Sequence, residues 1–256
     1  MKNILINTTE RIMMRNDIKC PYGCQYCFSK WDKFKNSIFS NSKVINYENN
    51  IIIYPFCDSE IVFQNYSEIL SNVIEYVNQS QRQIIISIST KSDLPHKILS
   101  DLELVNEILN KFNGFVKLSI SITNKNFQHI EAGTSSYNER INLLKRVNDY
   151  NIMSAVTLKP ILPFVPLKEY YEIIDETSDF TEKYLIGGLY VDINTDFYNN
   201  YIKNKYEVIH RKVNWLNNEI WHYVNSNQTQ KLIKEYIEQR GKDYFVSDTS
   251  LIESWF

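Results

Sequence analysis

The stretch Gln83–Thr90, which reads QIIISIST, decides the expected fold. It contains four isoleucines and no charged residue, a composition typical of a strand that is buried on both faces of a parallel sheet. The stretch Phe115–Ile122 (FVKLSISI) repeats this pattern after an interval of helical sequence. The two strands and the helix between them predict a parallel βαβ unit with a right-handed crossover.

Further strands and helices alternate on both sides of this unit. The other strand candidates are Arg11–Arg15, Ile51–Tyr54, Met153–Lys159 and Tyr184–Val191. The helical segments are Ser67–Asn78, His96–Phe112, Ser136–Asp149 and Leu167–Glu176. Six parallel strands that alternate with helices predict an α/β fold, a partial (β/α)6 barrel of the TIM type. Its functional face is expected at the carboxyl ends of the strands.

The sequence changes character after Asp192, where Asn, Tyr, Lys and Trp become frequent. Gln228–Arg240 has the pattern of an amphipathic helix that ends at Gly241. We therefore expect a barrel over residues 1–192 and a helical extension, packed on the barrel, over residues 193–256.

Overall composition limits the possible partners. The 256 residues carry 28 Lys and Arg against 30 Asp and Glu, so a net charge of −2 gives no support for strong nucleic-acid binding through bulk charge. No apolar run is long enough to span a bilayer, and the N-terminus does not have the pattern of a secretory signal. We expect a cytoplasmic protein with no membrane partner.

Three of the four cysteines lie in the loop after the first strand, in the sequence CPYGCQYC over residues 20–27. The spacing C-x3-C-x2-C brings three sulfurs to one side of a tight loop, whereas a disulfide framework would spread its cysteines along the chain. Three thiolates can bind three irons of a cubane cluster and leave the fourth iron open. Cys20, Cys24 and Cys27 are therefore predicted to hold a 4Fe–4S cluster.

Two alternatives compete with the iron–sulfur cluster. Three cysteines and one histidine can bind zinc, and the chain has four histidines, although none has finger-like spacing to the cysteines. Structural cysteines can also cluster by chance. A further alternative for the whole chain is therefore a non-enzymatic metal-binding module with a zinc or structural cluster.

The cysteine loop resembles the signature of the radical S-adenosylmethionine (SAM) superfamily, with Tyr26 as the aromatic residue before the last cysteine. The resemblance implies a partial-barrel core and SAM as a second cofactor, chelated to the open iron through its methionyl amine and carboxylate. One electron, from a donor such as flavodoxin or ferredoxin, then splits SAM into methionine and a 5′-deoxyadenosyl radical, which abstracts a hydrogen atom from the substrate.

Further segments are similar to the spore photoproduct lyase group (DNA repair photolyase-like), from about Arg11 to about Pro166. They are Cys57–Val62 (CDSEIV), Thr90–Ser92 (TKS) and His129–Arg140 (HIEAGTSSYNER). By position, Cys57 matches the thiol that in those lyases returns a hydrogen atom to the repaired thymine. A lone cysteine after a buried strand is equally often part of the core.

The same resemblance assigns several polar residues to SAM, although each of them could also be an ordinary solvated or structural side chain. They are Glu60, Lys91, Ser119 or Ser121, Glu131 and Arg140, together with Tyr26. An arginine such as Arg140 can bind a carboxylate with two parallel hydrogen bonds.

The implied activity is that of a radical SAM lyase in DNA repair, which acts on a pyrimidine lesion or a related nucleotide. One departure favours a different substrate: Phe28 stands where the lyases carry a tyrosine right after the last cluster cysteine. The alternative is a radical SAM enzyme that modifies a peptide or a small metabolite. With one spare cysteine, a second cluster is not expected.

Overall fold

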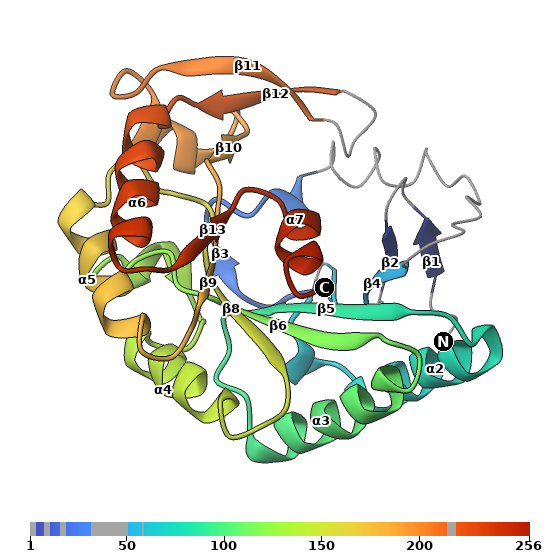
Figure 1. Cartoon of the computed structure of the whole chain (residues 1–256). Coiled ribbons are helices and arrows are strands. Elements are labelled where there is room, and N and C mark those ends of the chain that lie inside the picture. The colour runs from blue at the N-terminus through green and yellow to red at the C-terminus, as the bar shows by residue number, and fades with distance from the viewer. Residues whose placement is uncertain (1–3, 8–10, 16–18, 32–50, 58, 214–218) are drawn as a thin grey trace.

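The structure is a computed structural model that describes residues 4–7, 11–15, 19–31, 51–57, 59–213 and 219–256. Its central feature is a sheet with the strand order β1-β2-β4-β5-β6-β8-β9-β13 (Figure 1). The strands are β1 Ile4–Asn7, β2 Arg11–Arg15, β4 Ile51–Tyr54, β5 Ile84–Thr90, β6 Phe115–Ser121, β8 Met153–Leu158, β9 Lys183–Ile186 and β13 Asp243–Phe245. Only β1 runs antiparallel to its neighbour, and the other neighbouring pairs are parallel.

Five of the six predicted strands are present, and the sixth is present over its first half; together they lie side by side from β2 to β9 in the order of the chain. Four helices connect them along one face of the sheet (Figure 1). These helices are α2 Tyr66–Ser80, α3 His96–Asn110, α4 Tyr137–Val147 and α5 Leu167–Thr177. The structure therefore confirms the α/β class with a mainly parallel sheet, in the arrangement of a partial barrel.

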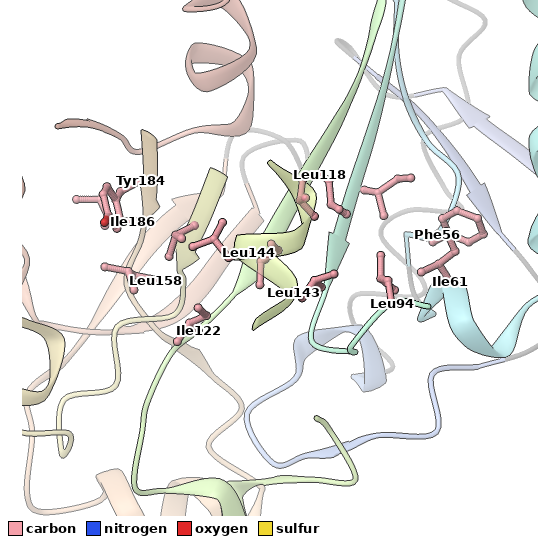
Figure 2. Close-up of a cluster of buried hydrophobic side chains, with 14 of the residues drawn as sticks. Phe56, Ile61, Leu94, Leu118, Ile122, Leu143, Leu144, Leu158, Tyr184 and Ile186 are labelled. Atoms are coloured by element: carbon pink, nitrogen blue, oxygen red, sulfur yellow. The ribbon is translucent and has the colours of Figure 1, made fainter. Parts of the chain in front are cut away.

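The two faces of the sheet explain why its strands are so rich in isoleucine. On β5, Ile84, Ile86 and Ile88 belong to the large core between the sheet and the helices. Leu118 of β6 and Leu144 of α4 lie in the same core (Figure 2). Ile85 points to the other face and packs with the carboxy-terminal helix instead. A strand covered on both sides needs apolar residues at nearly every position.

The start of α4 shows how the local sequence fixes an element. The Ser136 side chain accepts a hydrogen bond from the backbone N–H of Glu139, while the Glu139 carboxylate accepts one from the Ser136 N–H at 2.6 Å. This capping box sets the first turn of the helix. Glu131 and Arg140 flank it, so the box also sets the spacing between two residues of the site.

The predicted strand Tyr184–Val191 is in fact two strands in two different sheets. β9 ends at Ile186, and β10, Tyr190–Val191, joins a small antiparallel sheet in the order β10-β12-β11, with β11 Val208–Val213 and β12 Glu219–Val224. The break falls at Gly187 and Gly188. A Cβ atom on Gly188 would lie only 2.0 Å from the Tyr223 hydroxyl oxygen, so glycine is required where the two sheets meet.

The expected helical extension over residues 193–256 contains helices but also strands. α6, Asn227–Gln239, packs on α5, with the rings of Tyr171 and Tyr236 stacked at 4.0 Å between centroids. β11 and β12 form a hairpin, and β13 extends the main sheet beside β9. The chain ends with α7, Asp248–Glu253. The division into two domains remains a prediction.

Short elements surround the carboxyl ends of the strands. They are the strands β3 Gly23–Cys24 and β7 Glu131–Ala132, the 3-10 turns Phe28–Lys30, Ile61–Phe63 and Gln128–Ile130, and the π-helical turn Tyr198–Ile202. None of the described helices combines the length and the hydrophobicity that crossing a membrane requires.

Candidate functional site

The three clustered cysteines lie on a loop that is anchored at its middle. Cys24 belongs to β3, which pairs with β7 so that Cys24 lies opposite Glu131. The backbone N–H of Gln25 donates to the Ile130 carbonyl at 2.9 Å. At Gly23 a Cβ atom would lie 3.1 Å from the Ala132 Cβ, so a small residue allows this close approach. The cysteine loop is thereby fixed against the segment that follows β6.

The three thiols differ in burial. Cys24 is buried, Cys20 and Cys27 are half-buried, and all are free. Burial raises the pKa of Cys24 to about 12, although the nearby Lys91 charge opposes the rise, and burial also raises the pKa of Cys20. Thiols bind metals as thiolates, so metal binding at this loop would release protons.

The donor set of this loop suits a cluster better than a single ion. In the described part of the chain, no three or more His, Cys, Asp or Glu side chains are arranged around one ion position. The thiolates of a cubane each bind a different iron, so they need not converge on one point. Three free thiols on one anchored loop therefore fit three irons of a 4Fe–4S cluster.

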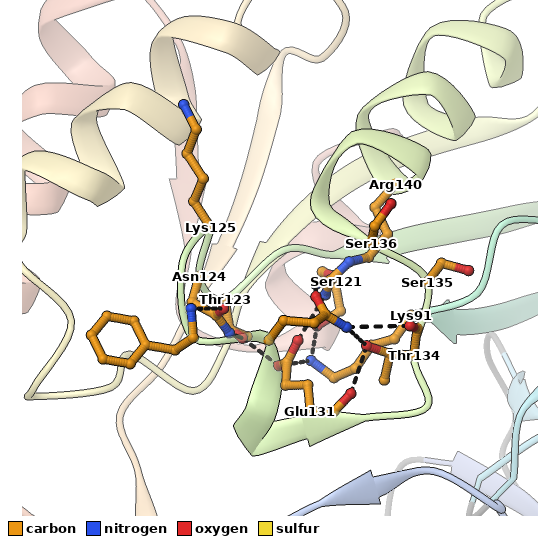
Figure 3. A network of polar contacts seen from close by, with 12 residues as sticks. Lys91, Ser121, Thr123, Asn124, Lys125, Glu131, Thr134, Ser135, Ser136 and Arg140 are labelled. Atoms are coloured by element: carbon orange, nitrogen blue, oxygen red, sulfur yellow. Dashed lines mark hydrogen bonds and ion pairs between the residues drawn. The ribbon is translucent and has the colours of Figure 1, made fainter.

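The Glu131 carboxylate is the centre of a buried polar network (Figure 3). Its Oε1 accepts hydrogen bonds from the Lys91 Nζ at 2.8 Å and from the hydroxyls of Tyr26 and Thr123. Its Oε2 accepts from the Arg140 Nη1 at 2.9 Å. Glu131 and Arg140 have no exposed surface, so both charges depend on each other and on Lys91.

The charges of this network fix its protonation states. Burial alone would raise the pKa of Glu131, but the charges of Lys91 and Arg140 outweigh it and hold the pKa at about 2. Burial and the adjacent Glu131 charge raise the pKa of the Tyr26 phenol well above its usual range. At neutral pH Glu131 is therefore ionised, and Tyr26 is a neutral hydrogen-bond donor to it.

Arg140 and Tyr26, which the resemblance assigns to SAM, lie behind Glu131 instead of at an open surface. The Arg140 Nη1 also donates to the Ser121 carbonyl at 2.8 Å. Tyr26 is 7% exposed. Both side chains hold Glu131 in place. Lys91, with 15% of its side chain exposed, is the cation of this network that a ligand can reach.

Glu60 supports the backbone that carries Lys91. Its carboxylate accepts hydrogen bonds from the Thr90 hydroxyl and the Lys91 backbone N–H, both at 2.7 Å, and from the Ser92 hydroxyl at 3.1 Å. Burial raises the pKa of Glu60, and these hydrogen bonds oppose the rise. The Tyr22 hydroxyl bonds to that of Ser92 at 2.7 Å, which joins this turn to the cysteine loop.

The two candidate serines of β6 point to the same face of the sheet. The Ser121 hydroxyl accepts a hydrogen bond from the Lys91 Nζ at 2.9 Å. The Ser119 hydroxyl is buried and has no partner among the described residues. Ser89, directly opposite Ser119 on β5, is exposed although its strand lies in the interior of the sheet. The face that carries Lys91 and Ser121 is therefore open at Ser89.

Cys57 packs against a buried pair of side chains from the small sheet, Val213 and Trp221. The side chains of Phe28, Trp31, Tyr54 and Tyr190 pack against the same pair. The ring centroids of Phe28 and Trp221 are 6.0 Å apart. Cys57 and the residue that follows Cys27 therefore contact a common cluster.

Two contributions to this region were not predicted from the sequence. Thr123, just beyond β6, donates to Glu131. Lys117 of β6 forms a buried ion pair with Asp248 of α7. The sequence did mark Lys117 as unusual, because it is the one charged residue in the stretch Phe115–Ile122. A lysine in a strand buried on both faces needs a partner.

The chain resembles known proteins in its sequence and in its fold. No family model matches the chain. The radical SAM cyclopropyl synthase TigE of Paramaledivibacter caminithermalis is 25% identical over 209 aligned positions, which cover 72% of this chain. The chain is therefore similar in sequence to a radical SAM enzyme. It spans 41% of the length of TigE, so the two proteins share only part of their sequence.

Solved structures show which fold the chain shares. A double mutant of spore photoproduct lyase with bound AdoMet and dinucleoside spore photoproduct has a TM-score of 0.64 at 17% identity. The lyase complexed with the dinucleoside alone has a TM-score of 0.59 at the same identity. Both alignments cover 89% of this chain and 73% of the lyase. The resemblance in the sequence is therefore confirmed, and the fold is that of spore photoproduct lyase.

Proposed function

We propose that this chain is a radical SAM enzyme whose cluster is held by Cys20, Cys24 and Cys27. The observation that carries the proposal is the pairing of β3 with β7, which joins the cysteine loop to the Glu131 network at the carboxyl ends of the strands. Cluster ligands and cofactor-binding groups then belong to one rigid unit.

When bound, the cluster and SAM supply a 5′-deoxyadenosyl radical for hydrogen abstraction. The chain's own residues position these groups. The Lys91 ammonium and the Ser121 hydroxyl, which accepts a hydrogen bond from it, are the groups that meet the polar end of SAM, with Ser119 one level further in on the same strand. Glu131, held by Tyr26 and Arg140, orients Lys91. Glu60 fixes the turn from which Lys91 extends.

As substrate we propose a pyrimidine lesion or a related nucleotide, with Cys57 as the hydrogen-atom donor. The shared fold with spore photoproduct lyase supports this choice, since its structures hold a dinucleoside spore photoproduct. The packing of Cys57 and of Phe28, the residue that follows Cys27, against the same buried pair also supports it. Removal of a hydrogen atom from a thiol is easy because the S–H bond is weak, which suits a donor to a carbon radical.

A second candidate substrate is a peptide or a small metabolite. Two observations favour it. The sequence relative TigE is a cyclopropyl synthase, not a lesion lyase. In addition, Phe28 has no hydroxyl hydrogen to give, so a radical relay through that position is not available. A flavodoxin or ferredoxin as electron donor and a cytoplasmic location accompany both candidates.

The test is release of 5′-deoxyadenosine by the anaerobically reconstituted, reduced protein, with and without DNA that carries spore photoproduct. Lesion-stimulated release with recovery of thymine supports the nucleotide substrate. Slow release that the lesion does not change keeps the radical SAM activity and moves the substrate to peptides and metabolites. A protein with an intact cluster that never cleaves SAM contradicts the proposed activity.

A further inference from the structure

We infer that the carboxy-terminal helix α7 is the inner cap of the barrel, held by the Lys117–Asp248 ion pair. Among the described residues, α7 closes one end of the space below Lys91, so that ligands enter this space at the carboxyl ends of the strands. We call the space over the face of the sheet that carries Lys91, Ser89 and Lys117 the chamber. That ligands enter this space rests on the proposed function.

The cap closes the face of the sheet that α2–α5 leave uncovered (Figure 1). Leu251 of α7 packs with Ala155 of β8 and Leu185 of β9. Ile252 packs with Ile85 and Phe115 at the amino-terminal ends of β5 and β6, and with Ile52 of β4. Leu251 is fully buried and Ile252 is 2% exposed. The helix therefore packs against side chains from five neighbouring strands, and on β5 and β6 these lie at the amino-terminal ends.

Next to these apolar contacts lies one buried polar contact, the ion pair between Lys117 and Asp248, which we call the lock. Lys117 has no exposed surface, and its Nζ donates to the Asp248 carboxylate and to the Ser87 hydroxyl, the latter at 3.2 Å. The hydroxyls of Ser87, at 2.9 Å, and of Tyr54 also donate to Asp248. Three strands thus bind one carboxylate of α7. A charge buried this completely requires its partner, so the lock opposes any displacement of the helix.

Positions along the strands set the depth of the chamber. Lys117, Ser119 and Ser121 alternate on one face of β6, and a strand rises about 3.3 Å per residue, so Lys117 lies about 13 Å below the Ser121 level. The level between them carries Ser119 and, in register with it, Ser89 of β5 and Ala155 of β8. Leu251 of α7 covers Ala155, whereas Ser89 is exposed. With α7 in place, the lock is the floor of this space.

The floor carries no net charge, because Asp248 neutralises Lys117, but it contains several hydroxyl groups. The hydroxyls of Tyr54 and Ser87 belong to this floor and donate to Asp248, and the exposed Ser89 hydroxyl lies one level above it. Such a surface favours an uncharged hydrogen-bonding group over a phosphate or a carboxylate. Lys117 and Asp248 contact each other and not the ligand, so they affect a ligand only by holding α7 and the floor in place.

The test uses the apo protein and an Ala155→Cys reporter, read by peptide mass mapping after treatment with N-ethylmaleimide. In the otherwise unchanged chain, the reporter is protected by Leu251. In the Asp248→Asn background we expect its labelling rate to rise about tenfold or more, because the unpaired Lys117 favours opening. Equal rates in both backgrounds, or a reporter that is reactive from the start, would overturn the inference.

Two further variants keep the test decisive if Asp248→Asn folds poorly. The pair Lys117→Met with Asp248→Leu replaces the lock by apolar groups, and we expect the reporter to stay protected. Lys242→Met breaks the more exposed pair with Glu182 and is the matched control, with no change expected. Rapid labelling in either variant contradicts the lock.

A second reporter separates the cap from the proposed function. Ser89→Cys in the reconstituted protein should be shielded by SAM when α7 is locked. If SAM gives no shielding while Ala155→Cys behaves as expected, the cap stands and the SAM site in this chamber is wrong. If Ala155→Cys fails and SAM still shields Ser89→Cys, the cofactor site stands without the cap.

Discussion

At the scale of single residues, Glu131 holds two cations with one carboxylate, the fully buried Arg140 and the partly exposed Lys91. Glu131→Gln removes the negative charge and leaves Arg140 buried without an ionic partner. We expect a loss of about 3 to 5 kcal/mol in the free energy of unfolding, measured with urea at neutral pH. Glu182→Gln, at a carboxylate 73% exposed, is the control, with an expected loss below about 1 kcal/mol.

The same carboxylate predicts a dependence of stability on acid. The pKa of Glu131 is about 2 in the folded chain against an ordinary 4.5, so its ionised form favours folding. This stabilisation is complete above pH 4.5 and is lost as the pH falls toward 2, an effect of about 3 kcal/mol. Urea unfolding from pH 6 to 2.5 should show a smaller acid loss in Glu131→Gln than in the unchanged chain. Parallel curves for the two proteins would contradict the assignment.

Cys57 and Cys20 make a second comparison between single residues. Both thiols are half-buried, but only Cys20 belongs to the anchored loop. We expect Cys57→Ala to keep the iron and sulfide content and the visible absorbance of the reconstituted protein, and Cys20→Ala to lose them, because a cluster needs each of its three thiolates. Loss of iron in Cys57→Ala would make Cys57 a ligand and remove its proposed role as hydrogen donor.

At the scale of elements, the junction between the two sheets depends on Gly188. An alanine Cβ there would overlap the ring of Tyr223 on β12, which is 2% exposed. We expect Gly188→Ala to cost about 1 to 3 kcal/mol of stability through overpacking, measured by thermal unfolding. Gly187→Ala meets only the flexible Lys159 side chain and should cost less. In a Tyr223→Leu background the cost of Gly188→Ala should shrink, as direct contact requires.

The elements also show how far the sequence could predict this fold. β5 and β6 were predictable because strands buried on both faces are uniformly apolar, and α4 because Ser136 and Glu139 cap it. The hairpin of β11 and β12 was not predicted. It reads VIHRKV and EIWHYV, with His and Lys among the apolar residues, so its strands lack a clear period of two. β13 has three residues, too few for any periodicity.

At the scale of the whole molecule, the contacts that complete the site join distant parts of the chain. The cysteines of the loop were predictable from their spacing, since one loop supplies all three. Asp248, by contrast, meets Lys117 across 131 positions of sequence, and Tyr26 meets Glu131 across 105. No local pattern encodes such pairs. They arise because the fold returns the chain end to the open face of the sheet, and because β3 pairs with β7.

The carboxy-terminal segment therefore contributes to the stability of the entire barrel. Leu251→Ala should leave a cavity against Ala155 and Leu185 and cost about 2 to 5 kcal/mol, measured by urea unfolding. Val246→Ala, two residues before α7 and 56% exposed, should change stability by less than about 0.5 kcal/mol. A cost that matches the Val246 control would mean that α7 detaches freely and that the barrel is stable without it. A large cost with a single cooperative transition would show that the sheet and its cap unfold together.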